Sequence, residues 1–362
     1  MNQTISLSDA ITLQRGFDLP MSQRRFGIYP VVTSTGMATR HDEFKVKGPG
    51  VVIGRSGSIG GGQYIEGDFW PLNTTLWVKD FKGNNEKFIY YLLKSLDFSS
   101  FNAGAAVPTL NRNHLSALKV RIPDRDEQDK IADTLGAIDE KIALNREMNE
   151  TLEQMGRALF RHYFIDNPEG EKWKQGVLTD IINLNPRESI SKNSEATYLE
   201  MKNMPEVGMS VKATEQRKFT SGMKFRNGDT LLARITPCLE NGKTAFVDFL
   251  DEGEVGFGST EYIVMRPKYD SFTEYTYFLA RSSVFRAFAI QSMVGTSGRQ
   301  RVQNNSVAMY EVTIPDTELI ADFHKKMQGA FAQIRNNAQQ IQTLTTLRDI
   351  LLLRLINGKI KF

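Results

Sequence analysis

Two long segments of the chain carry apolar residues three and four positions apart, the spacing of one face of an α-helix. One segment follows Ile122-Pro123 and the other follows Ile314-Pro315. Their apolar positions predict a helix-pair seam at Ile131, Leu135, Ile138, Ile142, Leu152 and Leu159, and at Met327, Ile334, Ile341, Leu344 and Leu351, with Met148 and Met155 extending the first stripe. Because each helix has a single apolar seam, we expect the two to pack together as an antiparallel coiled-coil pair.

Local signals also predict where both helices begin and end. Asp124 and Asp316 each follow an Ile-Pro pair directly and are predicted N-caps. Asn357-Gly358 predicts the end of the second helix, and Asn167-Pro168 predicts the end of the first.

The two remaining stretches contain short β-rich runs separated by Gly, Pro and Asn. In the first stretch, strands are predicted over residues 51–53, 63–65 and 76–78, with a helix over 86–96. In the second, strands are predicted over 230–232, 244–247 and 262–265, with a helix near 272–288. The order of elements is therefore the same in both stretches.

The chain thus contains an internal repeat. Residues 7–13 resemble residues 178–184, and each module is followed by Ile-Pro-Asp and a long helix. The predicted domains are 1–123, 124–168, 169–315 and 316–362, which alternate between module and helical spacer. The predicted fold class is α+β, with two α/β domains separated by an antiparallel helix pair in a pseudo-twofold repeat. Such an arrangement suits a ligand with two separated halves.

Bulk composition narrows the class of protein. The 362 residues are 40% hydrophobic and 24% charged, which is typical of globular domains. No apolar run approaches the roughly 18 residues of a membrane span, and the N-terminus lacks a secretion signal. The single cysteine, Cys238, excludes an internal disulfide framework and a cysteine zinc cluster. We therefore expect a cytoplasmic protein.

The distribution of charge says more than the net charge of +3. Acidic and basic residues alternate along the helical segments, whereas the modules hold basic clusters such as Arg24-Arg25 and Arg217-Lys218. Basic loops on globular modules attract a phosphate backbone. Solvated surface is the alternative interpretation of each single cluster.

The doubled order of short motifs resembles the specificity subunit of type I restriction-modification systems over nearly the whole chain. The segments that carry the resemblance are residues 7–20, 48–57, 70–78, 107–111, 123 and 127–128 in the first half, and 228–234, 258–262 and the terminal helix in the second. The second module departs from the pattern, because Gly298-Arg299-Gln300-Arg301-Val302 replaces the Val-Pro-Thr-Leu-Asn of residues 107–111.

The resemblance implies two target recognition domains, each reading one half of a split, asymmetric site in double-stranded DNA. It also implies two methyltransferase subunits docked on the helices, with S-adenosylmethionine bound by those partners and no cofactor bound by this chain. A translocating nuclease subunit is a further implied partner. Helices of about 35–40 residues would be roughly 50–60 Å long, enough to hold two reading domains about one to one and a half DNA turns apart.

Arg and Asn or Gln read base edges, while Lys and Ser more often hold phosphates. The candidate DNA contacts in the first module are Arg15, Arg24, Arg25, Arg40, Lys45, Arg55, Ser56, Asn111 and Arg112. Those in the second are Lys202, Lys212, Arg217, Lys218, Lys224, Arg234, Asn241, Lys243, Arg299, Gln300 and Arg301.

No catalytic constellation emerges from the sequence. Pro123-Asp124 with Asp139-Glu140-Lys141 superficially fits a metal-dependent nuclease, but four turns of helix would keep Asp124 and Asp139 more than about 20 Å apart. Asn185-Pro186 is a poor match to a methyl-transfer loop, and the four histidines lack metal-ligand spacing. We therefore expect a non-catalytic subunit without a metal. The alternatives are a coiled-coil adaptor for proteins and a self-sufficient nuclease or methyltransferase.

Overall fold

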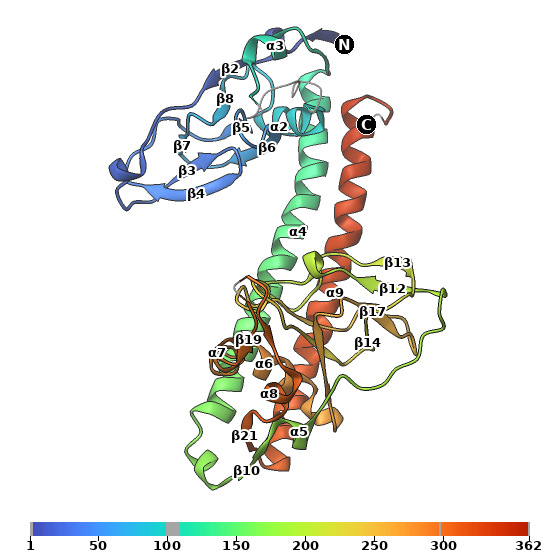
Figure 1. Cartoon of the computed structure of the whole chain (residues 1–362). Coiled ribbons are helices and arrows are strands. Elements are labelled where there is room, and N and C mark those ends of the chain that lie inside the picture. The colour runs from blue at the N-terminus through green and yellow to red at the C-terminus, as the bar shows by residue number, and fades with distance from the viewer. Residues whose placement is uncertain (1–2, 99–108, 297, 361–362) are drawn as a thin grey trace. The chain divides into compact units, whose positions relative to one another are not determined.

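A computed structural model describes residues 3–98, 109–296 and 298–360. The chain divides into two compact units, of which the first comprises Met1–Ile142 with Thr343–Phe362 and the second comprises Ala143–Gln342. Each unit contains one module and part of both long helices, α4 (Arg125–Phe160) and α9 (Thr317–Ile356) (Figure 1). In the described residues, no helix is both long enough and apolar enough to cross a bilayer.

The first unit is built on a four-stranded antiparallel sheet in the order β2-β8-β5-β6. These strands are β2 (Thr12–Arg15), β8 (Thr75–Asp80), β5 (Gly50–Gly54) and β6 (Gly60–Ile65). A second sheet has the order β4-β3-β7, formed by β4 (Gly36–His41), β3 (Tyr29–Thr33) and β7 (Trp70–Pro71). Strand β1 (Gln3–Ser6) pairs with β9 (Lys119–Ile122), and the helices are α1 (Leu7–Ala10), α2 (Glu86–Ser95) and α3 (Arg112–Ser116).

The second unit repeats this topology. Its first sheet has the order β11-β18-β15-β16, formed by β11 (Ile182–Leu184), β18 (Tyr262–Pro267), β15 (Thr230–Ala233) and β16 (Thr244–Phe246). Its second sheet has the order β13-β12-β17-β14, formed by β13 (Glu215–Lys218), β12 (Glu195–Leu199), β17 (Gly256–Gly258) and β14 (Met223–Phe225). Strand β10 (Lys174–Val177) pairs with β21 (Glu311–Ile314) as β1 does with β9. The predicted repeat is confirmed.

The predicted strands lie where expected. In β5 and β15 the apolar, often β-branched residues are buried on both faces, whereas residues 63–65 of β6 are half-buried. The predicted helix over 86–96 is α2. The prediction of one helix near 272–288 was wrong. The chain forms α6 (Thr273–Arg281) and α7 (Ser283–Gln291), because Ser282 adopts an extended conformation and accepts a hydrogen bond from the backbone N–H of Phe285. The second unit also has α5 (Leu178–Ile181), α8 (Asn304–Ala308) and a hairpin of β19 (Met293–Val294) and β20 (Arg301–Val302).

The long helices begin and end close to the predicted residues. Asp124 accepts a hydrogen bond from Glu127 N at 3.1 Å, and Asp316 accepts one from Glu318 N at 2.8 Å. Gly358 ends α9 with a positive φ of 66°, a conformation that glycine adopts without strain. After α4, a π-helical turn at Arg161–Ile165 continues the chain to the predicted stop at Asn167.

Both units show that α4 and α9 pair in antiparallel fashion, as predicted. In the first unit Arg348 donates to Asp139 at 2.8 Å. In the second, Asn145 donates to Gln340 at 3.0 Å and Tyr163 donates to Asp322 at 2.8 Å. Residue numbers on α9 fall as those on α4 rise, which defines the direction of the pair.

The residues of the predicted seam are only partly buried. Ile131, Leu135, Ile142, Met327 and Ile334 are buried, whereas Ile138, Leu152, Leu159, Ile341, Leu344 and Leu351 are half-buried. The extension of the seam to Met148 and Met155 was wrong, since these side chains are 36% and 56% exposed. In this part of the pair the buried face of α4 instead presents Asn145, Glu153 and Gly156.

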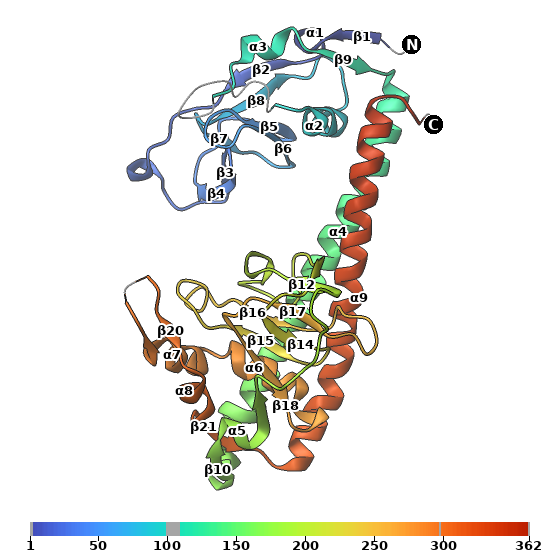
Figure 2. The same ribbon diagram turned by 45° about the vertical axis from the view of Figure 1, so that its right-hand side comes forward.

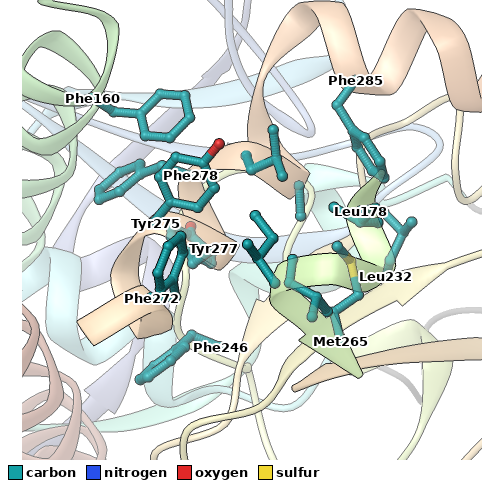
Figure 3. Packing of buried hydrophobic residues seen from close by; sticks show 14 of the residues in the cluster. Phe160, Leu178, Leu232, Phe246, Met265, Phe272, Tyr275, Tyr277, Phe278 and Phe285 are labelled. Atoms are coloured by element: carbon teal, nitrogen blue, oxygen red, sulfur yellow. The ribbon is translucent and has the colours of Figure 1, made fainter. Parts of the chain in front are cut away.

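The helices enter the cores of both modules. In the first unit, Ile131 and Leu135 of α4 and Leu352 and Leu355 of α9 belong to the same buried cluster as Phe88 of α2. In the second, Phe160 of α4 lies with Tyr275, Tyr277 and Phe278 of α6 and with Phe246, the aromatic group in Figure 3. A Cβ at Gly156 would lie 2.3 Å from Phe278, so this glycine lets α4 approach the aromatic core. The module cores therefore, and not only the helix pair, determine which helix faces are buried.

Candidate nucleic-acid interface

Three segments of the first unit meet at one end of β5. The backbone N–H of Arg55 donates to the carbonyl of Thr74 at 2.8 Å, and the carbonyl of Arg55 accepts from Leu110 N at 2.7 Å. The guanidinium of Arg55 donates to the carbonyl of Asn73 at 3.3 Å. The strand end therefore holds two loops in fixed register.

The second unit has the same framework at the end of β15. The backbone N–H of Arg234 donates to the carbonyl of Glu261 at 3.0 Å, and the carbonyl of Arg234 accepts from Val302 N at 3.0 Å. These bonds pair Arg55 with Arg234, Thr74 with Glu261 and Leu110 with Val302 as equivalent positions of the repeat.

The side chains placed by this shared framework differ between the units. Arg301 occupies the position equivalent to Thr109, and its Nε donates to both carboxylate oxygens of Glu261 at 2.9 Å. The hydrogen bond with Glu261 raises the pKa of the Arg301 guanidinium. Since Thr74 is the counterpart of Glu261, an ion pair in one unit replaces two uncharged residues in the other. The predicted departure of residues 298–302 from the first module's pattern lies here, while residues 107 and 108 of that pattern lie outside the described residues.

Arg234 has an unpartnered donor at this end of the sheet. Its side chain is half-buried, and within the described ranges its Nε is buried without a hydrogen-bond partner. A buried donor left unpaired costs about 1–3 kcal/mol, so a site completed by an acceptor would stabilise it. The oxygen of a phosphate or a base supplies such an acceptor.

Several of the predicted contact residues are held by their own module. Arg24, Arg40, Lys224 and Lys243 donate to the carbonyls of Leu19, Ile28, Glu188 and Met201, respectively. Asn111 is the N-cap of α3, Asn241 donates to Glu206 at 3.4 Å, and Lys45 lies over the ring of Trp70. These side chains shape the loops, which leaves their predicted role in DNA contact untested.

Four other predicted cations are exposed but paired with nearby carboxylates. The pairs are Arg15 with Asp18, Arg25 with Asp42 and Glu43, Lys202 with Glu200, and Arg217 with Glu215. Exposed ion pairs contribute about 0–1 kcal/mol each, so a phosphate could displace the carboxylates at little cost.

The predicted residues that are most open to a ligand lie on loops and strand edges. Arg112, Lys212, Lys218 and Arg299 are exposed, and the described part of the chain provides no ion pair for their side chains. Ser56 and Gln300 are half-buried, and Gln300 offers its carbonyl to Thr236 at 3.0 Å. The structure thus brings Arg234, Gln300 and Arg301 together in the second unit and Arg55, Ser56 and Asn111 in the first.

Two residues at these surfaces were not among the predicted contacts. Glu261 orients Arg301, and an alignment of the two repeats at Ala233 and Gly54 would have identified it. Phe26 is 99% exposed, and a phenylalanine in a Gly- and Arg-containing loop gives no such signal in the sequence.

The residues that resembled a nuclease site have structural roles. Asp124 caps α4, and hydrogen bonding by the N–H of Glu127 holds the pKa of its carboxyl below its usual range. Asp139 accepts hydrogen bonds from Tyr91 of α2 and Arg348 of α9, both at 2.8 Å. No group of three or more His, Cys, Asp or Glu side chains that could bind a metal occurs among the described residues.

Comparison with known proteins finds one matching domain and several remote relatives. Residues 2–154 match the type I restriction modification DNA specificity domain. The chain is 24% identical over 325 residues to the type I restriction enzyme MjaIX specificity subunit of Methanocaldococcus jannaschii, covering 80% of this chain and 73% of the relative. It is 22% identical to the HindI specificity subunit of Haemophilus influenzae, with 76% and 77% covered.

The fold leads to the same group of proteins. The crystal structure of the type I restriction-modification S subunit from M. genitalium matches with a TM-score of 0.67 at 16% identity, covering 98% of this chain and 96% of that one. That likeness shows the shared fold. The first part of the chain thus matches the type I restriction modification DNA specificity domain, and the chain as a whole is similar in sequence to type I restriction enzyme specificity subunits.

Proposed function

We propose that this chain reads a split site in double-stranded DNA and brings it to partner enzymes. Each unit contributes one reading domain, built on the strand-end loops that follow β5 and β15. The observation that carries the proposal is the duplicated backbone framework with unlike side chains, Thr74 and Thr109 in one unit against Glu261 and Arg301 in the other. Two readers with the same framework and different contacts would recognise two different half-sites.

The resemblance to type I specificity subunits supports a set of partners. Two methyltransferase subunits would bind the helix pair and carry S-adenosylmethionine, and a translocating nuclease subunit would complete a restriction complex. In this scheme the chain itself performs no chemistry, and its partners flip and methylate adenines at the site that it selects. In the proposed complex, the partner subunits would cover exposed apolar residues of α4 and α9, such as Leu144 and Leu353.

Mapping of methylated adenines in host DNA tests the proposal directly. Host cells with the gene should carry methylation at a two-part asymmetric sequence with an unread gap, and cells in which the gene is deleted should lack it. Binding of the purified complex to that duplex should weaken steeply as salt is raised, because phosphate contacts release counterions. An adaptor for proteins predicts unchanged methylation and no preference among DNA sequences. A self-sufficient enzyme predicts activity from the purified chain alone with Mg²⁺ or S-adenosylmethionine.

A further inference from the structure

An apolar group projects from the first reading domain with no protein surface to cover it. Phe26 is 99% exposed, and Met21 and Ile28 of the same loop are each 71% exposed. The loop lies ahead of β3, in the dark blue part of the ribbon (Figures 1 and 2). Single exposed apolar residues are common, but three on one loop, including a fully exposed phenylalanine, mark an interaction site.

The loop around Phe26 is fixed even though its ring is free. On one side, the backbone N–H of Arg25 donates to His41 Nδ1 at 3.1 Å, and its guanidinium donates to Asp42 at 2.6 Å. On the other side, Arg40 donates to the carbonyl of Ile28 at 2.6 Å. His41 is itself buried, and its ring lies edge-on to Trp70 with the centroids 5.3 Å apart.

Gly27 locks the loop to β4. A Cβ at this position would lie 2.3 Å from the backbone of Asp42, so only glycine allows the two segments to approach this closely. With both neighbours of Phe26 anchored, the ring is presented rigidly, and little conformational entropy would be lost when a partner covers it.

The charge around this loop indicates the kind of partner. Between residues 15 and 47 the chain has six basic residues, Arg15, Arg24, Arg25, Arg40, Lys45 and Lys47, and three acidic residues, Asp18, Asp42 and Glu43. This segment therefore carries a net charge of +3, which equals the formal net charge of the whole chain. An apolar side chain on a positively charged loop is complementary to DNA, in which stacked nucleobases lie inside a phosphate backbone.

We propose that Phe26 is a wedge that inserts between adjacent base pairs and kinks the DNA at the half-site read by the first unit. This inference rests on the proposed DNA-reading function and adds a means of recognition to it. Unstacking costs least at flexible pyrimidine–purine steps, so a wedge would favour such a step without making a hydrogen bond to any base. The second unit has no matching feature in the described residues, because the equivalent loop, residues 185–194, contains no aromatic side chain.

Fluorescence of 2-aminopurine, moved step by step through the methylated site, tests the wedge in the full chain with its methyltransferase subunits bound. Wild type should brighten the probe at one step of the first half-site, and energy transfer between end labels should report a bend. Phe26→Ala should remove both signals and weaken binding to the site about tenfold, within the range expected for loss of a stacked aromatic. The slope of affinity against salt should stay unchanged, because no phosphate contact is lost. Phe26→Leu, which keeps an apolar wedge, should retain most of the bend.

Tyr269→Ala is the matched control, since Tyr269 is a 63% exposed aromatic residue of the other unit. It should leave the probe signal and the affinity unchanged. Equal affinity and equal bending for Phe26→Ala and wild type would overturn the wedge. So would a Phe26→Ala variant that loses methyltransferase subunits on purification but, once assembled, bends DNA normally, because the ring would then face a protein. If wild type itself shows no site preference, the DNA-reading function fails and the wedge fails with it.

Discussion

At the scale of single residues, the second unit contains a carboxyl group whose ionisation opposes folding. Asp248 follows β16, and burial raises its pKa to about 6 despite the nearby Arg335. Its Oδ2 is buried and, within the described residues, accepts no hydrogen bond. The folded chain therefore holds this proton more tightly than the unfolded chain does between about pH 4 and 6.

Asp248 therefore makes the second unit less stable as pH rises. Asp248 contributes most favourably below about pH 4, where it is protonated in both states, and its contribution is lost as pH rises through 6. Asp248→Asn should raise the free energy of unfolding at pH 7 by about 1–3 kcal/mol and have little effect at pH 4. Urea unfolding of the variant and wild type at both pH values measures the difference. Asp251→Asn, on the exposed surface three residues away, is the control, and an equal gain from it would contradict the explanation.

A buried ion-pair network lies in the same unit, at the opposite end of β15 from Arg234. Arg266 donates to Asp229 at 2.6 and 2.8 Å and to Glu188 at 2.5 Å, and the Asp229 side chain is 1% exposed. Asp229 begins the turn into β15, where it also accepts from the N–H of Arg226 at 2.9 Å. The network therefore fixes the start of β15, the strand that leads to Arg234.

Removal of one partner from this network should be far more costly than removal of both. Arg266→Met leaves the Asp229 carboxylate buried without its cation, and we expect a loss of about 3–5 kcal/mol in unfolding free energy. Arg266→Met with Asp229→Asn should recover a large part of that loss, because the uncompensated charge is gone. Unfolding in guanidinium measures the free energy of unfolding of the single and the double variant. Equal values for the two would contradict this explanation.

At the scale of elements, the helix pair contains a polar layer in its interior. Asn337 donates to Asn149 at 2.8 Å, and Asn149 donates to the carbonyl of Ile334 at 3.3 Å. Asn145, fully buried, donates to Gln340. A buried amide pair of this kind stabilises only one register, because a shift along the helices would leave the amides unpaired among apolar side chains.

This layer predicts a contrast between single and paired substitutions. Asn337→Ala should lower the free energy of unfolding by about 1–3 kcal/mol, since Asn149 loses its partner. Replacing Asn149 and Asn337 together by leucine should give a melting temperature at or above that of wild type. Thermal unfolding followed by circular dichroism measures both. If the paired leucine variant were less stable than the single alanine variant, the amides would stabilise the helix pair as well as specify its register.

The same elements show what could be predicted from the sequence. The six predicted strands, the caps at Asp124 and Asp316 and the antiparallel pair were predicted correctly, because short-range periodicity and capping chemistry determine them. The break at Ser282 and the exposure of Met155 were missed, because the core of the second unit decides both. The carboxylate partners of most of the predicted cations could not be predicted from the sequence either. Asp42, for example, reaches Arg25 only because β3 and β4 pair.

At the scale of the whole molecule, the helix pair offers a test of how half-site spacing is set. The boundary between the units crosses α4 after Ile142 and α9 after Gln342. Seven residues inserted at both points would extend each helix by about 10 Å and preserve the contacts within each unit. We expect the unread gap to lengthen by roughly three base pairs, at about 3.4 Å per pair.

Methylation mapping in cells that carry the double insertion measures the gap. An insertion in α4 alone is the control, because it would put the two helices out of register and should abolish methylation. An unchanged gap in the double insertion would contradict the role of the helices as a spacer.

The assignment of residues 343–362 to the first unit has a consequence for how the protein is made. Leu352, Leu355 and Ile356 complete the core around α2, and Arg121 donates to the carbonyl of Leu355. The first unit therefore lacks part of its interior until residues 352–356 have been translated. A nascent or prematurely terminated chain without these residues would expose that interior and become a substrate for chaperones and proteases.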